Sequence, residues 1–429
     1  MYIRAMPGPF GRVSAPPPHF PVGGPVPASD LVGRETYIRR LGERLSDGNH
    51  VLVAGPRRIG KTSIILEVLR RLKRRGALTA YVDCLGATDI RGLGERLIDA
   101  VLENVSGAER SFEQAKAVAA GMRPSVKVKY EHIELALQLA REKNAQRFFE
   151  GALDLPRALA TRTGKRVVVA FDEFQAAGRL GPRVFDVMRT HFQAQKGVAY
   201  AFLGSEEGIL EQLFSEKGRA FYRFAVPIDL AEAGGHRFGI APDDWLTYLR
   251  EKFAEKKIAI DDSSVDRLLD ATGGHPQDTM QVCAALYYLM RDAAQRVVTA
   301  DLLAIAYEQA LRELERPFAL HWSELGQQKY LQLVATRVAQ GAVLFGSDTT
   351  PPVPRPEVLR ALESLRARGL VTRLGRGRYV FVEPMFGEYV RRVAGNEAVT
   401  AGGAKRTRQA DESGERRSTT AAGRHPPSR

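Results

Sequence analysis

The chain has 429 residues, of which 44% are apolar and 26% are charged, as in typical globular proteins. This composition excludes a collagen-like, coiled-coil or mainly disordered chain, and no apolar run approaches the ~18 residues that span a bilayer. The formal net charge of +13 makes a polyanionic partner a hypothesis to test. We expect two to three domains in a cytoplasmic protein without a membrane partner.

The two ends of the chain differ in composition from its middle. Residues 1–29 contain eight of the 23 prolines, which lack a backbone donor, so we expect an extended or loosely packed segment. Residues 395–429 are rich in Gly, Ser, Thr and Arg and have few apolar side chains, which predicts a disordered basic tail.

Short apolar strands alternate with helices from residue 51 to about 230. The predicted strands are 51–54, 78–84, 166–171, 198–203 and 224–229. Their nearly continuous apolar character is typical of strands that are covered on both faces, and a helix over 61–75 has one apolar side. The alternation predicts an α/β domain with a mostly parallel sheet, and the long stretch 106–164 indicates additional helices.

The strongest chemical signal follows the first predicted strand. Residues 55–62, GPRRIGKT, match the pattern GxxxxGK[ST] in full. In such a loop, backbone N–H groups and the helix N-terminus bind phosphate oxygens, the lysine reaches the β- and γ-phosphates, and the hydroxyl binds Mg²⁺. The predicted nucleotide-binding residues are Gly55, Pro56, Arg57, Arg58, Ile59, Gly60, Lys61, Thr62 and Ser63. The alternative is a glycine-rich turn that only connects strand and helix.

Two acids, Asp172 and Glu173, directly follow the apolar run 167–171. An acid at the end of such a strand holds Mg²⁺, usually through water, and a second acid orients and activates an attacking water as general base. The predicted metal ligands are therefore Thr62 and Asp172, and Glu173 and Lys61 are predicted catalytic residues. The pair of acids favours hydrolysis; a P-loop phosphotransferase and a solvated acidic turn remain alternatives.

The pattern becomes entirely helical from residue 240 to about 314, with breaks at 261–264 and 272–276. A third unit follows over 318–394. Its predicted elements are helices at 320–339 and 356–368 and strands at 370–374 and 378–382. Gly375-Arg-Gly377 between the strands is typical of a hairpin, and helix, helix and hairpin predict a winged helix–turn–helix.

Arginines are concentrated in this third unit. They are Arg355, Arg360, Arg366, Arg368, Arg373, Arg376 and Arg378. A helix in the major groove with a basic wing on phosphate would bind DNA. A protein-interaction module or a solvated arginine face is the alternative.

Five motifs in chain order resemble the archaeal-type ATPase family, a STAND-like branch of the AAA+ class. They are DLVGRE at 30–35, GPRRIGKTS at 55–63, DEFQ at 172–175, LGS at 203–205 and GGHP at 273–276. The resemblance extends roughly from residue 20 to residue 394. It implies a P-loop NTPase with a parallel sheet core, a helical lid and a C-terminal winged helix domain.

The resemblance also implies roles outside the phosphate loop. Gly33 and Arg34 would lie near the base or ribose, and His275 and Pro276 near the β-phosphate and adenine. Ser205 would act as a sensor of the γ-phosphate or of the attacking water. The alternatives are helix capping at the first pair and at Ser205, and a helix stop and restart around Pro276.

The resemblance implies that Arg223 of one subunit would contact the phosphate bound to a neighbouring subunit, in trans, like an arginine finger. A surface or core-edge arginine is the alternative. The chain departs from the family at Tyr37, where many members carry a second acid two positions after GRE. The departure concerns the base side of the site and not its phosphate chemistry.

These observations predict five segments: an extended N-terminal segment (1–29), a P-loop ATPase core (30–235), a helical lid (236–315), a winged helix (316–394) and a disordered tail (395–429). We expect a Mg²⁺-dependent ATPase that binds ATP, switches conformation with its nucleotide and turns over slowly until a protein partner or a second copy completes the site. A DNA-binding regulator in which ATP only sets conformation is the alternative function.

Overall fold

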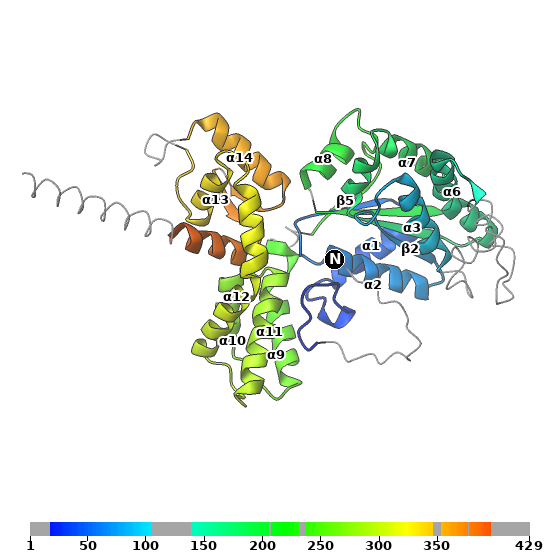
Figure 1. Cartoon of the computed structure of the whole chain (residues 1–429). Coiled ribbons are helices and arrows are strands. Elements are labelled where there is room, and N and C mark those ends of the chain that lie inside the picture. Colours follow the sequence, from blue (N-terminus) through cyan, green and yellow to red (C-terminus); the bar gives the residue numbers. More distant parts are fainter. Residues whose placement is uncertain are drawn as a thin grey trace, which may run out of the picture. The chain divides into compact units, whose positions relative to one another are not determined.

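The computed structural model describes residues 18–103, 139, 141–205, 207–230, 237–345, 353–375 and 377–395. The chain divides into two compact units, a first unit of Met1–Ala310 and a second unit of Leu311–Arg429 (Figure 1). Most of the helices predicted within 106–164, and nearly all of the predicted tail, lie outside the described residues. No described helix combines the length and the apolar character that a bilayer span requires. The division into five segments stays a prediction.

Five parallel strands form the sheet of the first unit, in the order β2-β3-β4-β1-β5. They are β1 (Val51–Ala54), β2 (Leu78–Asp83), β3 (Val167–Asp172), β4 (Val198–Gly204) and β5 (Val226–Asp229). The predicted parallel α/β core is therefore confirmed. Strands β3 and β4 are buried along their whole length, because helices cover both faces. We call the edge where all strands end the carboxyl edge, and the opposite one the amino edge.

Two sets of helices pack on this sheet (Figure 1). The first set is α1 (Glu35–Ser46) with α2 (Lys61–Arg74), and the second includes α3 (Ile90–Leu102), α6 (Ala145–Thr163), α7 (Val184–Gln193) and α8 (Glu207–Ser215). Phe171, Tyr200 and Phe202 belong to an aromatic-rich core with the second set. Since strand residues alternate between the two faces, this core and the α1–α2 pair cover opposite sides.

The helices predicted after residue 240 are confirmed as α9 (Pro242–Ala254), α10 (Asp262–Thr272) and α11 (Pro276–Asp292), and α10 packs against both of the others. We call residues 237–292 the lid, after the helical lid that the sequence predicts here. Both predicted breaks have local causes. Asp261 caps α10 through its side chain, and Gly273 ends α10 in the left-handed conformation. Pro276 then occupies the first turn of α11, where its missing N–H is tolerated.

Residues 18–27 contain no regular element before the 3-10 turn η1 (Ala28–Asp30), and most of residues 22–29 are exposed, but His19 and Phe20 pack against α9. The Phe20 side chain is buried, with its ring centroid 4.8 Å from that of Phe253 in α9. His19 Nε2 lies 2.7 Å from the carbonyl oxygen of Lys252. The expectation of an extended or loosely packed segment stays a prediction, and the packing of His19 and Phe20 is a contact that the proline content did not reveal.

The second unit begins within α12 (Ala300–Leu325) and continues through α13 (Leu331–Ala339), α14 (Arg355–Ala367), β6 (Val371–Gly375) and β7 (Arg378–Phe381). Residues 384–395 are helical. Strands β6 and β7 pair antiparallel, which confirms the predicted hairpin, and α14 confirms the helix at 356–368. Arg376 lies outside the described residues. Assignment of the whole unit as a winged helix stays a prediction.

The single helix predicted over 320–339 is wrong. The helix α12 continues through Pro317 to Leu325, and α13 starts only at residue 331. Tyr330 just before it has a positive φ of 65°, which a continuous helix excludes. Residues 326–329, GQQK, interrupt the apolar spacing, and Gly326 directly after α12 was the available sequence signal for this break. Phe318, which is buried next to Pro317, shows that packing overrides the helix-breaking tendency of proline here.

Candidate active site

The loop of residues 55–60 connects β1 to the first residue of α2. Gly55 has φ 155° and Gly60 φ 92°, angles that other residues rarely adopt, and a Cβ on Gly55 would come within 2.9 Å of the Ile59 side chain. Gly60 gives the first turn of α2 no side-chain cap. Because the first N–H groups of a helix lack intrahelical acceptors and carry the positive end of its dipole, this end suits an anion.

The ammonium group of Lys61 lies across the same loop. Its Nζ donates to the carbonyl oxygens of Gly55 at 2.7 Å and Pro56 at 2.5 Å, and the residue is 7% exposed. Hydrogen bonds between two ionised groups are stronger than those from a cation to a neutral carbonyl. A phosphate at this end of α2 would therefore compete for the ammonium group.

Asp172, the last residue of β3, accepts three hydrogen bonds. Thr62 Oγ1 donates to Oδ2 at 2.6 Å, the Tyr81 hydroxyl donates to the same oxygen at 2.8 Å, and the backbone N–H of Glu173 donates to Oδ1 at 2.9 Å. Burial and the charge of Asp172 raise the pKa of Tyr81, so this hydroxyl remains a donor. A hydroxyl and a carboxylate this close together are the oxygen ligands that Mg²⁺ prefers, so Thr62 and Asp172 fit a magnesium ion.

The carboxylate of Glu173 belongs to a second polar network. Its Oε2 accepts from Ser205 Oγ at 2.9 Å and from Gln175 Nε2 at 2.5 Å, while Ser205 Oγ accepts from Arg57 Nε at 3.2 Å. Glu173 has a positive φ of 47°, an uncommon conformation for a non-glycine residue. The network joins the phosphate loop to the acidic strand end through the predicted sensor Ser205.

Strand order explains why Ser205 lies between these two motifs. Strand β4, which Ser205 follows, is hydrogen-bonded to β1 on one side and to β3 on the other. The three strands end at the same edge, so the loop, the serine and the acids meet there. Sequence reasoning named Ser205 but gave no role to Gln175 or Tyr81; the Gln two residues after Glu173 was the available signal for the first of them.

Arg34 is 2% exposed, and its guanidinium bridges two backbone segments. Nη1 donates to the carbonyl oxygen of Phe238 at 2.7 Å and Nη2 to that of Ile59 at 3.0 Å. Burial lowers the pKa of Arg34 to about 10, so the group is still charged at neutral pH. Gly33 has φ 63°, and a Cβ there would lie 2.7 Å from Oδ2 of Asp244 in α9. The pair therefore connects the phosphate loop with the start of the lid.

His275 is fully buried and caps α11, its Nδ1 lying 3.3 Å from the backbone nitrogen of Asp278. Its ring meets that of Phe238 edge-on at 5.0 Å. Pro276 occupies the first turn of the same helix. Both residues therefore have a structural role at the start of α11. The His275 ring also contacts Phe238, the residue whose carbonyl oxygen accepts from Arg34.

Two further contacts on the lid side were missed by sequence reasoning. Asp30, 7% exposed, pairs with Lys252 Nζ at 2.8 Å and accepts from the Tyr248 hydroxyl at 2.7 Å, both from α9. Ser63 Oγ accepts from the backbone N–H of Val26 at 3.0 Å. The only sequence signal for the first contact is that Tyr248 and Lys252 are four residues apart, on one side of a helix.

Arg223 is not brought to the site of its own chain. It precedes β5 by three residues and is exposed, so it lies toward the amino edge, whereas the phosphate loop lies at the carboxyl edge. Its φ is 53°, and its guanidinium lies over the Tyr222 ring at 5.3 Å.

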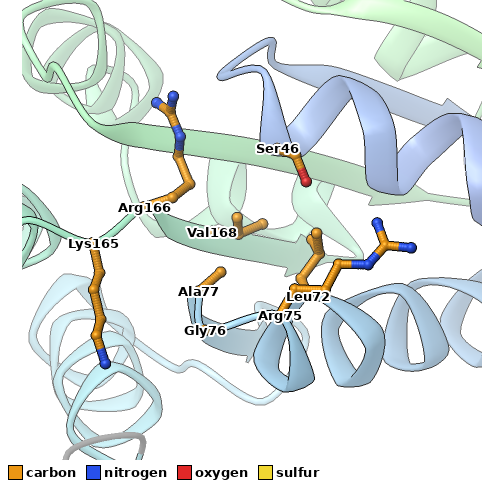
Figure 2. A pocket seen from close by; sticks show the side chains of 8 residues that line it. All are labelled: Ser46, Leu72, Arg75, Gly76, Ala77, Lys165, Arg166 and Val168. Carbon is orange, nitrogen blue, oxygen red and sulfur yellow. The ribbon is translucent and has the colours of Figure 1, made fainter.

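A cavity of about 210 Å³ lies at the amino edge and contains none of the predicted site residues. It is lined by Ser46, Leu72, Arg75, Gly76, Ala77, Lys165, Arg166 and Val168. Figure 2 shows Lys165 and Arg166 pointing in opposite directions, so these cations do not converge on a ligand. We therefore locate the candidate active site at the carboxyl edge.

Comparisons with known proteins show what the chain is similar to. Residues 30–203 match the family model of the AAA ATPase domain. The Walker-type ATPase PABY2304 of Pyrococcus abyssi is similar in structure, with a TM-score of 0.61 at 18% identity over 87% of this chain and 99% of that one. The ORC2 protein of Aeropyrum pernix, solved in ADPNP–ADP complexes, has a TM-score of 0.51 at 15% identity, over 86% and 95%. No curated protein matches the chain. The sheet is thus that of a P-loop ATPase fold.

Proposed function

We propose that the first unit binds ATP with Mg²⁺ and hydrolyses it to ADP and phosphate. The observation that carries this proposal is the 2.6 Å hydrogen bond from Thr62 to Asp172, which unites the phosphate loop and the acidic strand end. The match of residues 30–203 to the AAA ATPase domain supports it. So does the similarity in fold to a Walker-type ATPase.

The residues then divide the chemistry. The loop amides and Lys61 hold the phosphates, and Thr62 and Asp172 hold Mg²⁺, which when bound neutralises charge on the phosphate oxygens. Glu173 orients and deprotonates the attacking water. Ser205 donates to Glu173 and accepts from Arg57 of the loop. Through these two hydrogen bonds, Ser205 and Glu173 respond to the γ-phosphate.

The lid completes the nucleotide site in this proposal. Gly33 and Arg34 lie where the phosphate loop meets the lid, and His275 and Pro276 start α11, with the His275 ring against Phe238, whose carbonyl oxygen Arg34 binds. Because Arg34 binds carbonyl oxygens of both Ile59 and Phe238, a change in the loop on nucleotide binding reaches the lid directly. This contact supports a nucleotide-driven conformational switch.

The exposed position of Arg223 supports a partner that completes the site. An arginine that is distant from its own loop is available to a second copy of the chain or to another protein. We therefore propose slow turnover in the isolated chain and faster turnover in an assembly.

Two substitutions test the activity. Lys61→Ala removes the cation that faces the phosphates, and we expect at least a hundredfold loss of ATP affinity, measured with a fluorescent ATP analogue. Glu173→Gln should keep the affinity within about threefold and lower phosphate release at least a hundredfold, since only the general base is lost. Lys73→Ala, an exposed lysine on the same helix, is the matched control and should change neither quantity.

Unchanged phosphate release in both site variants would contradict the proposed site. The assay also separates the phosphotransferase alternative, because a hydrolase releases phosphate without any added acceptor. ADP formation only in the presence of an acceptor molecule would favour transfer instead.

A second candidate function is DNA binding by the second unit, which would then act as a winged helix. The observation in its favour is a set of exposed arginines on α14 and on the hairpin: Arg355, Arg360, Arg366, Arg373 and Arg378. Phosphate contacts by such groups weaken steeply with salt. A gel-shift series over salt concentration tests the proposal, and absence of a shift at the lowest salt would reject it.

A further inference from the structure

Tyr81 lies at the carboxyl edge but belongs to neither of the two motifs. It is in β2, where it is paired with Ala170 of β3, and Asp83 is paired with Asp172. Residues two apart along a strand lie on the same face, and diagonal neighbours on adjacent strands are within reach of an aromatic side chain. The Tyr81 hydroxyl crosses to Asp172 in this way and donates to Oδ2 at 2.8 Å.

The two side-chain donors to Asp172 differ in what holds them. Thr62 is in the first turn of α2, directly after the phosphate loop, so it belongs to the part that meets the nucleotide. Tyr81 is in a strand that is hydrogen-bonded to β3 along its whole length. The backbones of Tyr81 and Asp172 are therefore held relative to each other by the hydrogen bonds between β2 and β3.

We propose that Tyr81 is a positioning residue that holds the carboxylate of Asp172 in the orientation in which it binds Mg²⁺. The inference rests on the proposed function of this site. A carboxylate that serves a metal rotates about its last bond unless a second partner fixes it, and loss of such a partner typically lowers metal affinity 10- to 100-fold. Tyr81 acts through Asp172 and touches neither nucleotide nor metal.

The same sheet offers a matched control. Tyr200 in β4 is buried, whereas Tyr81 is half-buried, and the Tyr200 hydroxyl donates to Gln195 Oε1 at 2.7 Å. Gln195 lies in the turn before β4, at the amino edge. Tyr200→Phe therefore removes a tyrosine hydroxyl and one hydrogen bond, as Tyr81→Phe does, but at the opposite end of the strands.

The experiment is a titration of free Mg²⁺ at fixed fluorescent ADP, for the wild-type chain and both variants, with a parallel measurement in EDTA. We expect Tyr81→Phe to need about tenfold more Mg²⁺ for half-maximal binding, with its affinity in EDTA unchanged. Saturating Mg²⁺ should restore binding. Tyr200→Phe should follow the wild type in both conditions.

The controls separate the inference from the function on which it rests. If wild-type binding does not depend on Mg²⁺, the proposed function of the site fails. If the wild type depends on Mg²⁺ and Tyr81→Phe has the same requirement, or loses affinity equally in EDTA, the positioning role is wrong.

A second background guards against a general structural effect. In Asp172→Asn, which no longer offers Mg²⁺ a carboxylate, Tyr81→Phe should change the Mg²⁺ requirement by less than about twofold, since residues that act as one unit are not additive. A further tenfold increase in that background would overturn the inference.

Discussion

Charged groups gather in two regions of this protein, and their partners differ. At the carboxyl edge of the sheet they are buried and have defined partners: Asp172 accepts three hydrogen bonds and Arg34 donates to two carbonyl oxygens. On α14 and the hairpin of the second unit, Arg355, Arg360, Arg366, Arg373 and Arg378 are exposed, and the contacts of two of them are local. Arg360 pairs with Glu357 one turn away, and Arg373 donates to the carbonyl oxygen of Gly375.

The difference follows from solvation. A buried charge without partners costs several kcal/mol, so its partners are specified by the fold and carry information about mechanism. An exposed ion pair contributes roughly 0–1 kcal/mol and leaves the side chain free to rearrange. The partners of the buried groups at the carboxyl edge therefore indicate a particular chemistry. The exposed arginines of the second unit indicate only that this surface is positively charged. Three measurements test this distinction.

The largest effect is expected at Arg34. Arg34→Met keeps the apolar length of the side chain but leaves the carbonyl oxygens of Ile59 and Phe238 without this donor, and we expect the first unit to lose about 2–4 kcal/mol of unfolding free energy. The chain has two tryptophans. In a Trp322→Phe background, fluorescence of buried Trp245 in the lid reports urea unfolding of this unit alone.

Arg39→Met is the matched control for this measurement. Arg39 lies on the next turn of the chain, in α1, but its side chain is 58% exposed and pairs with Glu43. We expect a change within about 0.5 kcal/mol. Equal urea midpoints for the two variants would mean that the buried bridge does not hold loop and lid together.

Contiguous motifs and contacts between distant segments also differ in how well the sequence predicts them. The strands, the loop 55–62 and the acids 172–173 are contiguous patterns, so spacing alone located them. The contacts of Arg34, Asp30 and Tyr81 join segments that are distant in sequence, and one chain contains no periodicity that reveals which buried groups will pair. Arg34 illustrates the limit: the resemblance implied a place near the base or ribose, which stays a prediction, but gave no sign that the guanidinium binds two backbone carbonyl oxygens.

A smaller effect is expected at His50, a half-buried group that is neutral at pH 7. Its Nδ1 accepts a hydrogen bond from the backbone N–H of Tyr200 at 3.1 Å, and its ring stacks on Phe224 with ring centroids 4.4 Å apart. Burial, with the positive charge of Arg189, lowers the pKa of His50 to about 4. Below the ordinary value of 6.5 the unfolded chain takes up a proton that the folded chain refuses.

The stability from His50 is therefore full above about pH 6.5 and is lost as the pH falls through about 4. After allowance for solvent screening, we expect the loss to be about 1–2 kcal/mol. His50→Asn keeps an acceptor for the Tyr200 N–H but does not titrate. Urea midpoints between pH 7.5 and 4.5 should thus fall less steeply for the variant; parallel curves would show that His50 titrates normally in the folded chain.

The smallest effect on stability is expected at the hairpin of the second unit. Arg373 and Arg378 are exposed, so replacing both by Ala should change the unfolding free energy, followed through Trp322, by less than about 0.5 kcal/mol. If the hairpin binds DNA backbone, the same change lowers the slope of log affinity against log salt by about 0.9 for each lost phosphate contact. Anisotropy of a labelled duplex over a salt series measures that slope.

Arg40 and Arg44, exposed on α1 of the first unit, provide the matched control for charge, because replacing both by Ala changes the net charge equally. A slope that falls in the hairpin variant alone would give Arg373 and Arg378 a specific role in binding DNA. The two regions would then differ in the burial of their charged groups, but both would have a function. An equal fall in both variants would mean that DNA responds only to net charge. In that case the carboxyl edge would be the one region of the two whose charged groups have a defined task.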